Sequence, residues 1–236
     1  MEAMREASVS VVIPARNAER YLGAALQTVL AQTAGRMEII VVDDASTDGT
    51  GAAAAALAGN GVTCLALPEK RGAAGARNYG VGAASGDYLA FLDADDLWLP
   101  ERTAVLGRAL ASQGGRAIAL GHVEQFISPE IAPERRRTLA APPPPMPAYV
   151  AGGILMRRAD FLAVGAFDET LTLGEFIDWF GRARRAGLAE IVVPDIVLRR
   201  RIHGDNTSLR QRAAAGDYLE VARRALARKR DNEFKS

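Results

Sequence analysis

The first 125 residues alternate short apolar runs with longer helical patterns, and this alternation constrains the fold more than any other feature. Five runs have the length and the apolar or β-branched character of strands: residues 9–15, 37–44, 62–67, 87–95 and 116–123. Helical patterns separate them, such as residues 18–32, where apolar side chains form one stripe. Apolar strands joined by helices predict an α/β fold in which a mostly parallel central sheet is covered on both faces.

Polar residues gather where the first, second and fourth of these runs end. The three endings read "PARN" (14–17), "VVDDAST" (41–47) and "LDADD" (92–96). Parallel strands present their carboxyl ends at one edge of a sheet, and ligands bind there, near a switch in strand order. The sequence therefore predicts a single ligand site at this edge, built from three strand ends.

The aspartates of "LDADD" admit two interpretations. Asp93 and Asp95 stand two residues apart on an extended chain, so they point to the same side and can hold one hard divalent cation. Such a cation would neutralise a diphosphate, which the carboxylates alone would repel. The alternative is a solvated loop in which an aspartate caps the helix beginning near Pro100. The position at the ligand edge favours the cation site.

Two more residues near this edge have paired interpretations. Asp44, or its neighbour Asp43, either caps the following helix or accepts hydrogen bonds from a nucleobase or a ribose. Arg77, near the start of a small-residue helix, either faces a phosphate or pairs with one of the aspartates. The Gly80-Val81-Gly82 sequence in that helix is not a dinucleotide fingerprint, which would follow a strand directly. We expect these small residues to allow close packing on the sheet.

Residues 126–236 show a different organisation. A Pro-rich, charged segment at 126–147 predicts a long loop. The patterns after it are a strand-to-helix unit at 151–167, an amphipathic helix at 173–187, one or two strands at 189–203 and a basic helix at 208–230. These few strands need the first sheet to pack on, so we expect one domain that includes both parts.

Three residues of this second part are candidates for chemistry. Glu175 and Asp178 are three residues apart and so share one face of a helix. They either deprotonate an acceptor hydroxyl or only complement the positive end of the helix dipole. His203 follows a basic strand and precedes a Gly-Asp-Asn turn, so it is either a structural histidine or a ligand in an exposed loop.

The composition of the chain limits the kinds of partner that it is expected to bind. The sequence is 49% hydrophobic and 24% charged with a net charge of +1, so no global field favours nucleic acid as a partner. A single cysteine, Cys64, excludes an intramolecular disulfide, and a cytoplasmic location is expected. No run approaches the roughly 18 to 20 apolar residues of a transmembrane helix. The basic C-terminal segment allows peripheral contact with a membrane surface as a second interpretation.

Five stretches of the chain together resemble glycosyltransferase family 2. They are "VSVVIPARNAERYLGAALQTVLAQT", "EIIVVDDASTDGT", "RGAAGARNYGVGAASGDYLAFLDADDLWLP", "GGILMRRADFLAVGAFDE" and "RRRIHGDNTS". The resemblance runs in order over residues 8–210. It implies a GT-A (Rossmann-like) three-layer sandwich, a nucleotide-diphospho-sugar donor, which we expect to be a UDP-sugar, and Mn2+ or Mg2+ as cofactor. Residues 1–125 would then form the nucleotide-sugar-binding half of the domain, and residues 126–236 the acceptor-binding half with the C-terminal helix.

The resemblance also implies roles for individual residues. The nucleotide sugar would contact residues of the three strand ends and of the small-residue helix: Pro14, Ala15, Arg16, Asn17, Asp44, Arg77, Asp93 and Ala94. Asp44 would contact the uracil base. The metal ligands would be Asp93, Asp95 and His203.

Family members typically invert the anomeric centre with a carboxylate base. The family often has Gly-Glu-Asp at the base, whereas this chain has Phe176 in place of the aspartate. We therefore expect Glu175 to be the base, with Asp178 as the second choice. Trp179 would line the acceptor or pack in the core. The alternative to an enzyme is a non-catalytic nucleotide-sugar-binding partner protein.

The acceptor is open at this stage. A glycan, a lipid-linked sugar, a small molecule or a peptide side chain would each provide the hydroxyl. We expect acceptor choice to depend on the long loop at 126–147 and on Gly152 and Gly153.

Overall fold

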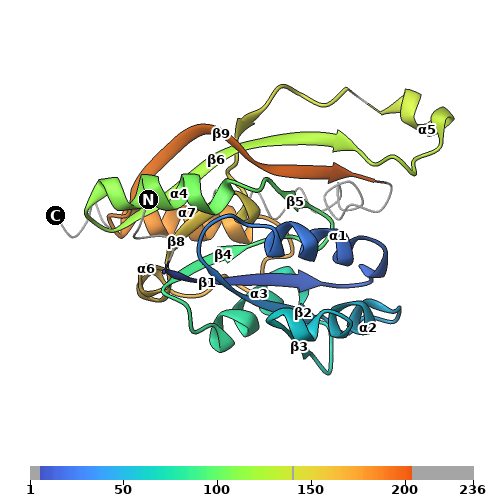
Figure 1. Ribbon diagram of the computed structural model, residues 1–236, viewed down its shortest axis with the longest axis horizontal. Helices are drawn as coiled ribbons and strands as arrows, with labels where there is room; N and C mark the ends of the chain where they lie inside the picture. The colour runs from blue at the N-terminus through green and yellow to red at the C-terminus, as the bar shows by residue number, and fades with distance from the viewer. Residues whose placement is uncertain (1–5, 140, 204–236) are drawn as a thin grey trace.

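The first four strands of the protein form a parallel half-sheet in the computed structural model, which describes residues 6–139 and 141–203 (Figure 1). Their order across the sheet is β3 (Val62–Ala66), β2 (Arg36–Asp43), β1 (Ser8–Ala15) and β4 (Tyr88–Phe91). All four predicted strands are confirmed. β4 ends earlier than expected, because the chain turns where the Asp96 amide donates to the Asp93 carbonyl at 3.0 Å.

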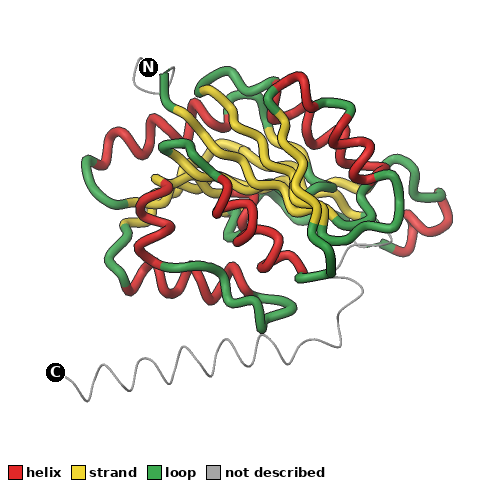
Figure 2. The backbone as a smooth tube through the Cα atoms, turned by 90° about the horizontal axis from the view of Figure 1, so that it is seen from below, coloured by secondary structure: helices red, strands yellow, loops and turns green. Residues whose placement is uncertain are grey.

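Helices cover both faces of this sheet. α1 (Glu19–Leu30), α2 (Thr50–Ala55) and α4 (Arg102–Gln113) pack on one face, and α3 (Gly72–Ala83), α6 (Arg158–Val164) and α7 (Glu175–Arg185) on the other (Figure 2). Alternate strand residues point to opposite faces, so Val11 lies in the first core and Val12 in the second. The expected three-layer sandwich is confirmed.

The second part of the chain extends the same sheet. β8 (Ile154–Arg157) pairs antiparallel with β4, and the sheet then continues through β6 (Ala117–Ile127), β9 (Ala189–Ile202) and β5 (Leu97–Trp98). Among the nine strands that residues 6–139 and 141–203 contain, six run in one direction, and β5, β7 (Met146–Pro147) and β8 run in the other. The mostly parallel sheet is therefore confirmed, and its strands come from both parts of the sequence.

Two segments differ from the sequence expectation in detail. Residues 189–203 form one long strand, β9, whose register against β6 shifts opposite residues 193–195 and so accommodates Pro194. The expected loop at 126–147 contains the short helix α5 (Pro133–Thr138) and β7, which pairs with β6. We call residues 128–139 and 141–147 the arm, and in Figure 1 α5 lies at its far end. The predicted helix at 208–230 lies outside the described residues.

Short 3-10 turns complete the described structure: η2 (Ala58–Asn60) precedes β3, and η3 (Ala151–Gly153) precedes β8. A side chain at Gly153 would meet the Ala148 Cβ at 2.4 Å, so close packing accounts for this glycine. Gly80 is similar, because a Cβ there would lie 2.4 Å from Val12 Cγ1, whereas a Cβ at Gly82 would meet nothing within 4 Å. Close packing of α3 on the sheet thus explains Gly80 and not Gly82.

Within residues 6–139 and 141–203, none of the helices combines the length and the hydropathy needed to cross a lipid bilayer.

Candidate active site

The ends of β1 and β2 are joined into one rigid edge. The Arg16 guanidinium donates to the Asp44 carbonyl at 2.7 Å, and the Asn17 side-chain oxygen accepts the Thr47 amide at 2.8 Å. Asn17 and Ala45 have positive φ angles of 48° and 53°, in the left-handed region that most side chains avoid. These contacts place the "PARN" segment, including Pro14 and Ala15, directly beside the "VVDDAST" segment.

Asp44 links this edge to α3. Its carboxylate accepts the backbone amide of Arg71 at 2.6 Å and that of Gly72 at 3.0 Å, and the residue is 3% exposed. Neither Asp43 nor Asp44 caps the next helix, because Asp48 accepts the amide of Thr50 at the start of α2. The helix-cap interpretation is therefore wrong, and the uracil contact of Asp44 stays a prediction.

Arg77 connects the "LDADD" segment to α7. Its guanidinium donates to Asp93 Oδ1 and to Glu175 Oε1, each at 2.6 Å, and its side chain is 5% exposed. Burial lowers the pKa of Arg77, but the charges of Asp93 and Glu175 outweigh it and raise the pKa above its usual value. Arg77 is thus a permanent cation that pairs with an aspartate, as one sequence interpretation expected. It also holds the candidate base in the same site.

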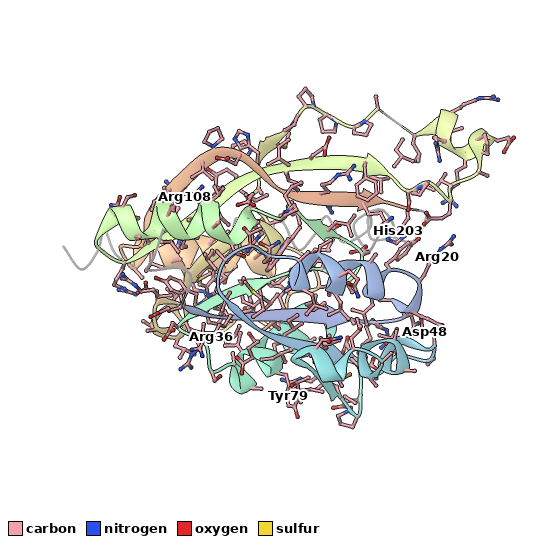
Figure 3. All side chains as sticks on the ribbon, in the orientation of Figure 1. Arg20, Arg36, Asp48, Tyr79, Arg108 and His203 are labelled. Atoms are coloured by element: carbon pink, nitrogen blue, oxygen red, sulfur yellow. The ribbon has the colours of Figure 1, made fainter. Side chains whose placement is uncertain are left out.

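Asp95 and His203 meet at the same edge. His203 Nε2 lies 2.9 Å from Asp95 Oδ2, although the two residues are 108 positions apart in the sequence, and Ala94 beside Asp95 is buried. In the view of Figure 3, His203 lies toward the same end of the molecule as Asp48, and Arg108 lies toward the other. The structure therefore brings the late histidine to the aspartate motif.

The Asp95 and His203 pair fits a divalent cation in its donor chemistry. A carboxylate and an imidazole are ordinary ligands of Mn2+, and Mg2+ is commonly held by one or two carboxylates and substrate phosphates. No group of three or more histidine, cysteine or acidic side chains is arranged for a metal in the part of the chain that the structure describes. Asp93 stands nearby with 43% of its side chain exposed, but one of its oxygens is bound to Arg77. Phosphate oxygens of a donor would therefore have to complete the coordination.

Asp96, the third aspartate of the motif, has a structural position. It is 4% exposed and its carboxyl accepts the backbone amide of Arg201 at 2.8 Å. Burial, together with the charges of Asp95 and Asp93, raises its pKa well above the usual value. Asp96 joins the strand end to β9 rather than facing the ligand edge.

The two candidate bases differ in their surroundings. Asp178 is 4% exposed and pairs with Arg182, one turn along α7, at 2.9 Å. Glu175 reaches Arg77 and through it Asp93, at the ligand edge. Glu175 is therefore the candidate base that Arg77 joins to the strand-end site.

Residues after Glu175 form an aromatic core. Trp179 is 0% exposed, its ring stacks on Phe161 at 5.0 Å between centroids, and its indole donates to the Gly165 carbonyl. Phe176 packs against Trp179, with 6.4 Å between ring centroids. The interpretation of Trp179 as an acceptor wall is wrong, since no part of its surface is exposed. Phe176, which stands where the sequence resemblance led us to expect an aspartate, is 6% exposed and belongs to this core.

One set of contacts was not found from the sequence. The Asn78 amide donates to the Phe167 carbonyl and accepts the Phe167 amide, both at 2.9 Å, and Arg71 pairs with Glu169 at 2.7 Å. These contacts hold the segment before Glu175 against α3. A hydrogen bond from Asn78 lowers the pKa of Glu169, and Arg71 adds to this effect. Only the position of Asn78 next to Arg77 signalled such a role.

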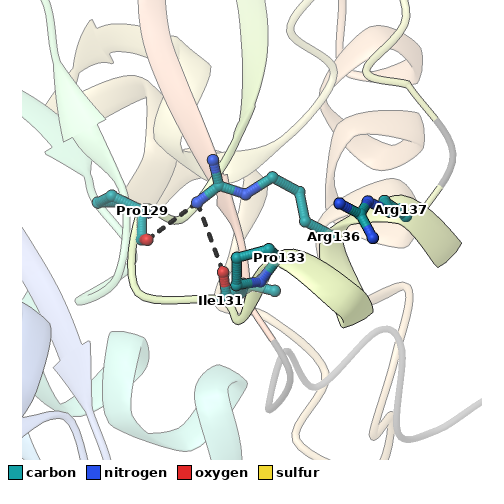
Figure 4. A pocket seen from close by; sticks show the side chains of 5 residues that line it. All are labelled: Pro129, Ile131, Pro133, Arg136 and Arg137. Carbon is teal, nitrogen blue, oxygen red and sulfur yellow. Dashed lines mark hydrogen bonds between the residues drawn. The ribbon is translucent and has the colours of Figure 1, made fainter.

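A shallow pocket of about 350 Å3 lies within the arm, between residues 129–131 and α5, and none of the predicted site residues lines it. Pro129, Ile131 and Pro133 line it together with two arginines of α5 (Figure 4). Arg136 Nη2 donates to the Pro129 carbonyl at 2.9 Å and points across the pocket. This arginine stabilises the loop that leads into α5, so the residues around the pocket stabilise the conformation of the arm.

The sequence model described as glycosyl transferase family 2 matches residues 10–163, which include all three strand ends and η3. The chain belongs to glycosyltransferase family 2. Among curated members it is 34% identical over 160 residues to the succinoglycan biosynthesis protein ExoO of Rhizobium meliloti, covering 63% of this chain and 43% of ExoO. It is 38% identical over 94 residues to the Escherichia coli protein named UDP-Glc:alpha-D-GlcNAc-diphosphoundecaprenol beta-1,3-glucosyltransferase WfgD, covering 40% and 37%. The chain thus spans less than half of these family members.

Solved structures of other proteins share the fold. TarS of S. aureus superposes with a TM-score of 0.71 at 19% identity, covering 92% of this chain and 39% of TarS. The mannosyltransferase PcManGT from Pyrobaculum calidifontis, in complex with GDP-Man and Mn2+, has a TM-score of 0.69 at 21% identity, covering 94% and 65%. These similarities confirm the GT-A fold that the sequence resemblance implied.

Proposed function

We propose that the protein is an inverting glycosyltransferase that moves a sugar from a UDP-sugar to a hydroxyl acceptor and needs Mn2+ or Mg2+. The observation that carries the proposal is the Arg77 bridge, which holds Asp93 and Glu175 at 2.6 Å from one guanidinium. Asp93, a carboxylate of the ligand edge, and Glu175, the candidate base, thereby share one site. The choice of UDP is supported by WfgD, whose name specifies UDP-Glc, and by a TarS structure in complex with UDP.

The strand ends would bind the donor. Residues 14–17 and Asp44 would line the nucleotide, and Asp93, Ala94 and Arg77 would lie beside the diphosphate. Asp95 and His203, with Asp93, would hold the cation, which when bound supplies positive charge that stabilises the leaving nucleoside diphosphate. The rigid contacts between Arg16, Asn17 and the β2 end support this role, because a preorganised site loses little entropy on binding.

Glu175 would act as the general base. The acceptor oxygen forms a bond to the anomeric carbon while the bond from that carbon to the phosphate oxygen breaks, and UDP leaves with the electron pair. The acceptor proton moves to the Glu175 carboxylate. The pair with Arg182 and the burial of Asp178 disfavour this second candidate, since a carboxylate that is 4% exposed and bound to an arginine is poorly placed to take a proton from an acceptor hydroxyl.

We propose a lipid-linked sugar as the acceptor class. The support is the name of WfgD, whose acceptor is a GlcNAc diphosphate on a long lipid. A lipid-linked acceptor places the reaction at a membrane surface, where the arm, with three consecutive arginines in α5, offers peripheral contact. On this proposal residues 1–125 bind the donor, with His203 completing the cation site, and the rest of residues 126–236 binds the acceptor.

The experiment that tests the function separates binding from turnover. UDP with Mn2+ should raise the melting temperature of the wild-type protein, and Asp95→Ala should abolish the metal-dependent part of the rise. Glu175→Gln should keep the rise and lose transfer to a lipid-linked sugar. Binding without turnover in the wild type, across UDP-sugars and acceptor classes, would favour the non-catalytic partner protein instead.

A further inference from the structure

The carboxyl end of β9 docks on the aspartate motif through Arg201. The backbone amide of Arg201 donates to Asp96 Oδ1 at 2.8 Å, and its guanidinium Nε donates to the Asp95 carbonyl at 2.9 Å. Arg201 and His203 are two residues apart at the end of an extended strand, so their side chains point to the same side. Both therefore face the same neighbouring element.

That neighbour is the Tyr21 ring on α1. The rings of Tyr21 and His203 lie 4.7 Å apart between centroids, tilted by 37°, and the Arg201 guanidinium carbon lies 5.0 Å from the Tyr21 centroid. Aromatic rings at this separation attract each other, and a guanidinium near an aromatic ring adds a cation–π interaction. Tyr21 thus packs against both side chains that bring β9 to the aspartates.

The Tyr21 hydroxyl is held in turn by the arm. It donates to Glu130 Oε1 at 2.6 Å, while the Ser128 hydroxyl donates to Glu130 Oε2 at 2.5 Å. Arg201 Nη1 also reaches the Ser128 hydroxyl at 3.0 Å, which closes a ring of contacts between α1, the arm and β9.

We propose that Tyr21 is a positioning residue for the cation and diphosphate site: its ring holds His203 beside Asp95, and its hydroxyl orients that ring through Glu130. The inference rests on the proposed function, because it assigns His203 to the side of the cation. It adds a residue of α1 to a site that otherwise draws on the strand ends, Arg77 of α3 and His203 after β9. It also joins the arm to the donor site, since Glu130 belongs to the arm.

A matched pair of variants separates the ring from the hydroxyl. Tyr21→Phe keeps the ring beside His203 and removes the bond to Glu130, whereas Tyr21→Leu removes both. The binding readout is the Kd of UDP in the presence and absence of Mn2+, measured by calorimetry on the full chain. We expect Tyr21→Leu to weaken the Mn2+-dependent binding by on the order of ten-fold, as supporting residues around metal ligands commonly do. Tyr21→Phe should change the Mn2+-dependent Kd less than Tyr21→Leu does.

A second readout follows His203 directly. The chain has two histidines, His122 and His203, so their ring proton signals are separable by nuclear magnetic resonance and assigned with His203→Ala. Loss of the Tyr21 ring current should shift the His203 signal in Tyr21→Leu and leave His122 unchanged. Mn2+ is paramagnetic and should broaden the His203 signal with UDP present, and this broadening should weaken in Tyr21→Leu.

The outcomes distinguish the inference from the function it rests on. If His203→Ala weakens Mn2+-dependent binding, and the double variant His203→Ala/Tyr21→Leu binds no more weakly than His203→Ala alone, the two residues act together as proposed. Additive losses, or an unshifted His203 signal in a folded Tyr21→Leu protein, would overturn the positioning role while leaving the function in place. If Asp95→Ala and His203→Ala both bind UDP and Mn2+ like the wild type, the cation site itself fails, and the inference with it.

Discussion

Replacement of Arg77 by methionine is the most informative single change. Methionine keeps much of the side-chain length but leaves Asp93 and Glu175 facing each other without the cation between them. Removing one partner of a buried ion pair costs about 3–5 kcal/mol of unfolding free energy. Two features favour the lower end of that range. Asp93 is 43% exposed and so partly solvated. The buried Arg77 Nε meets no hydrogen-bond partner among the described residues, so the removal of this unsatisfied donor offsets part of the lost unfolding free energy.

A loss of about 3 kcal/mol corresponds to a fall in melting temperature of roughly 6–12 °C for a protein of this size. Differential scanning calorimetry on Arg77→Met, with Arg108→Met as control, measures it. Arg108 is an exposed arginine of α4, and its loss should change the unfolding free energy by no more than about 0.5 kcal/mol. Equal melting temperatures for the two variants would refute the reasoning, because they would show that the Arg77 pairs are as weak as surface contacts.

Three further predictions concern the base, the packing of α3 and the arm. Glu175→Gln should lower the transfer rate by about 10²- to 10⁴-fold in a single-turnover assay with UDP affinity retained, whereas Asp178→Asn should lose stability and keep most of its turnover; the opposite pattern would exchange the two roles. Gly80→Ala should destabilise the protein by about 1–3 kcal/mol in denaturant unfolding because its Cβ has no room, and Gly82→Ala should be neutral or stabilising; equal effects would contradict the close packing. Burial raises the pKa of Glu130, but hydrogen bonds from Ser128 and Tyr21 outweigh this and lower it to about 2. Its contribution to stability is therefore present above about pH 4.5 and disappears as the pH falls toward 2, so Glu130→Gln should flatten the dependence of unfolding on pH across that window; an unchanged slope would show that these hydrogen bonds do not stabilise the folded state.

The local sequence determined the sheet and the location of the site. Apolar strand runs and helical stripes are properties of neighbouring residues, so the first four strands and the helices between them were predicted within a few residues. The geometry of parallel strands then placed "PARN", "VVDDAST" and "LDADD" at one edge, where the structure has them. The motifs in order along the chain were sufficient to indicate family 2.

Only the tertiary structure decided which candidate side chains meet. Arg77 reaches Glu175 across 98 residues of sequence, and His203 reaches Asp95 across 108, because α7 and β9 pack where they do. The same packing buries Trp179. A strand or helix pattern specifies which face a residue occupies, but the partner on that face comes from another element of the fold. The contacts of Tyr21 are the clearest case, since its position in the helical pattern of residues 18–32 gave no sign that its ring lies against His203 in the structure.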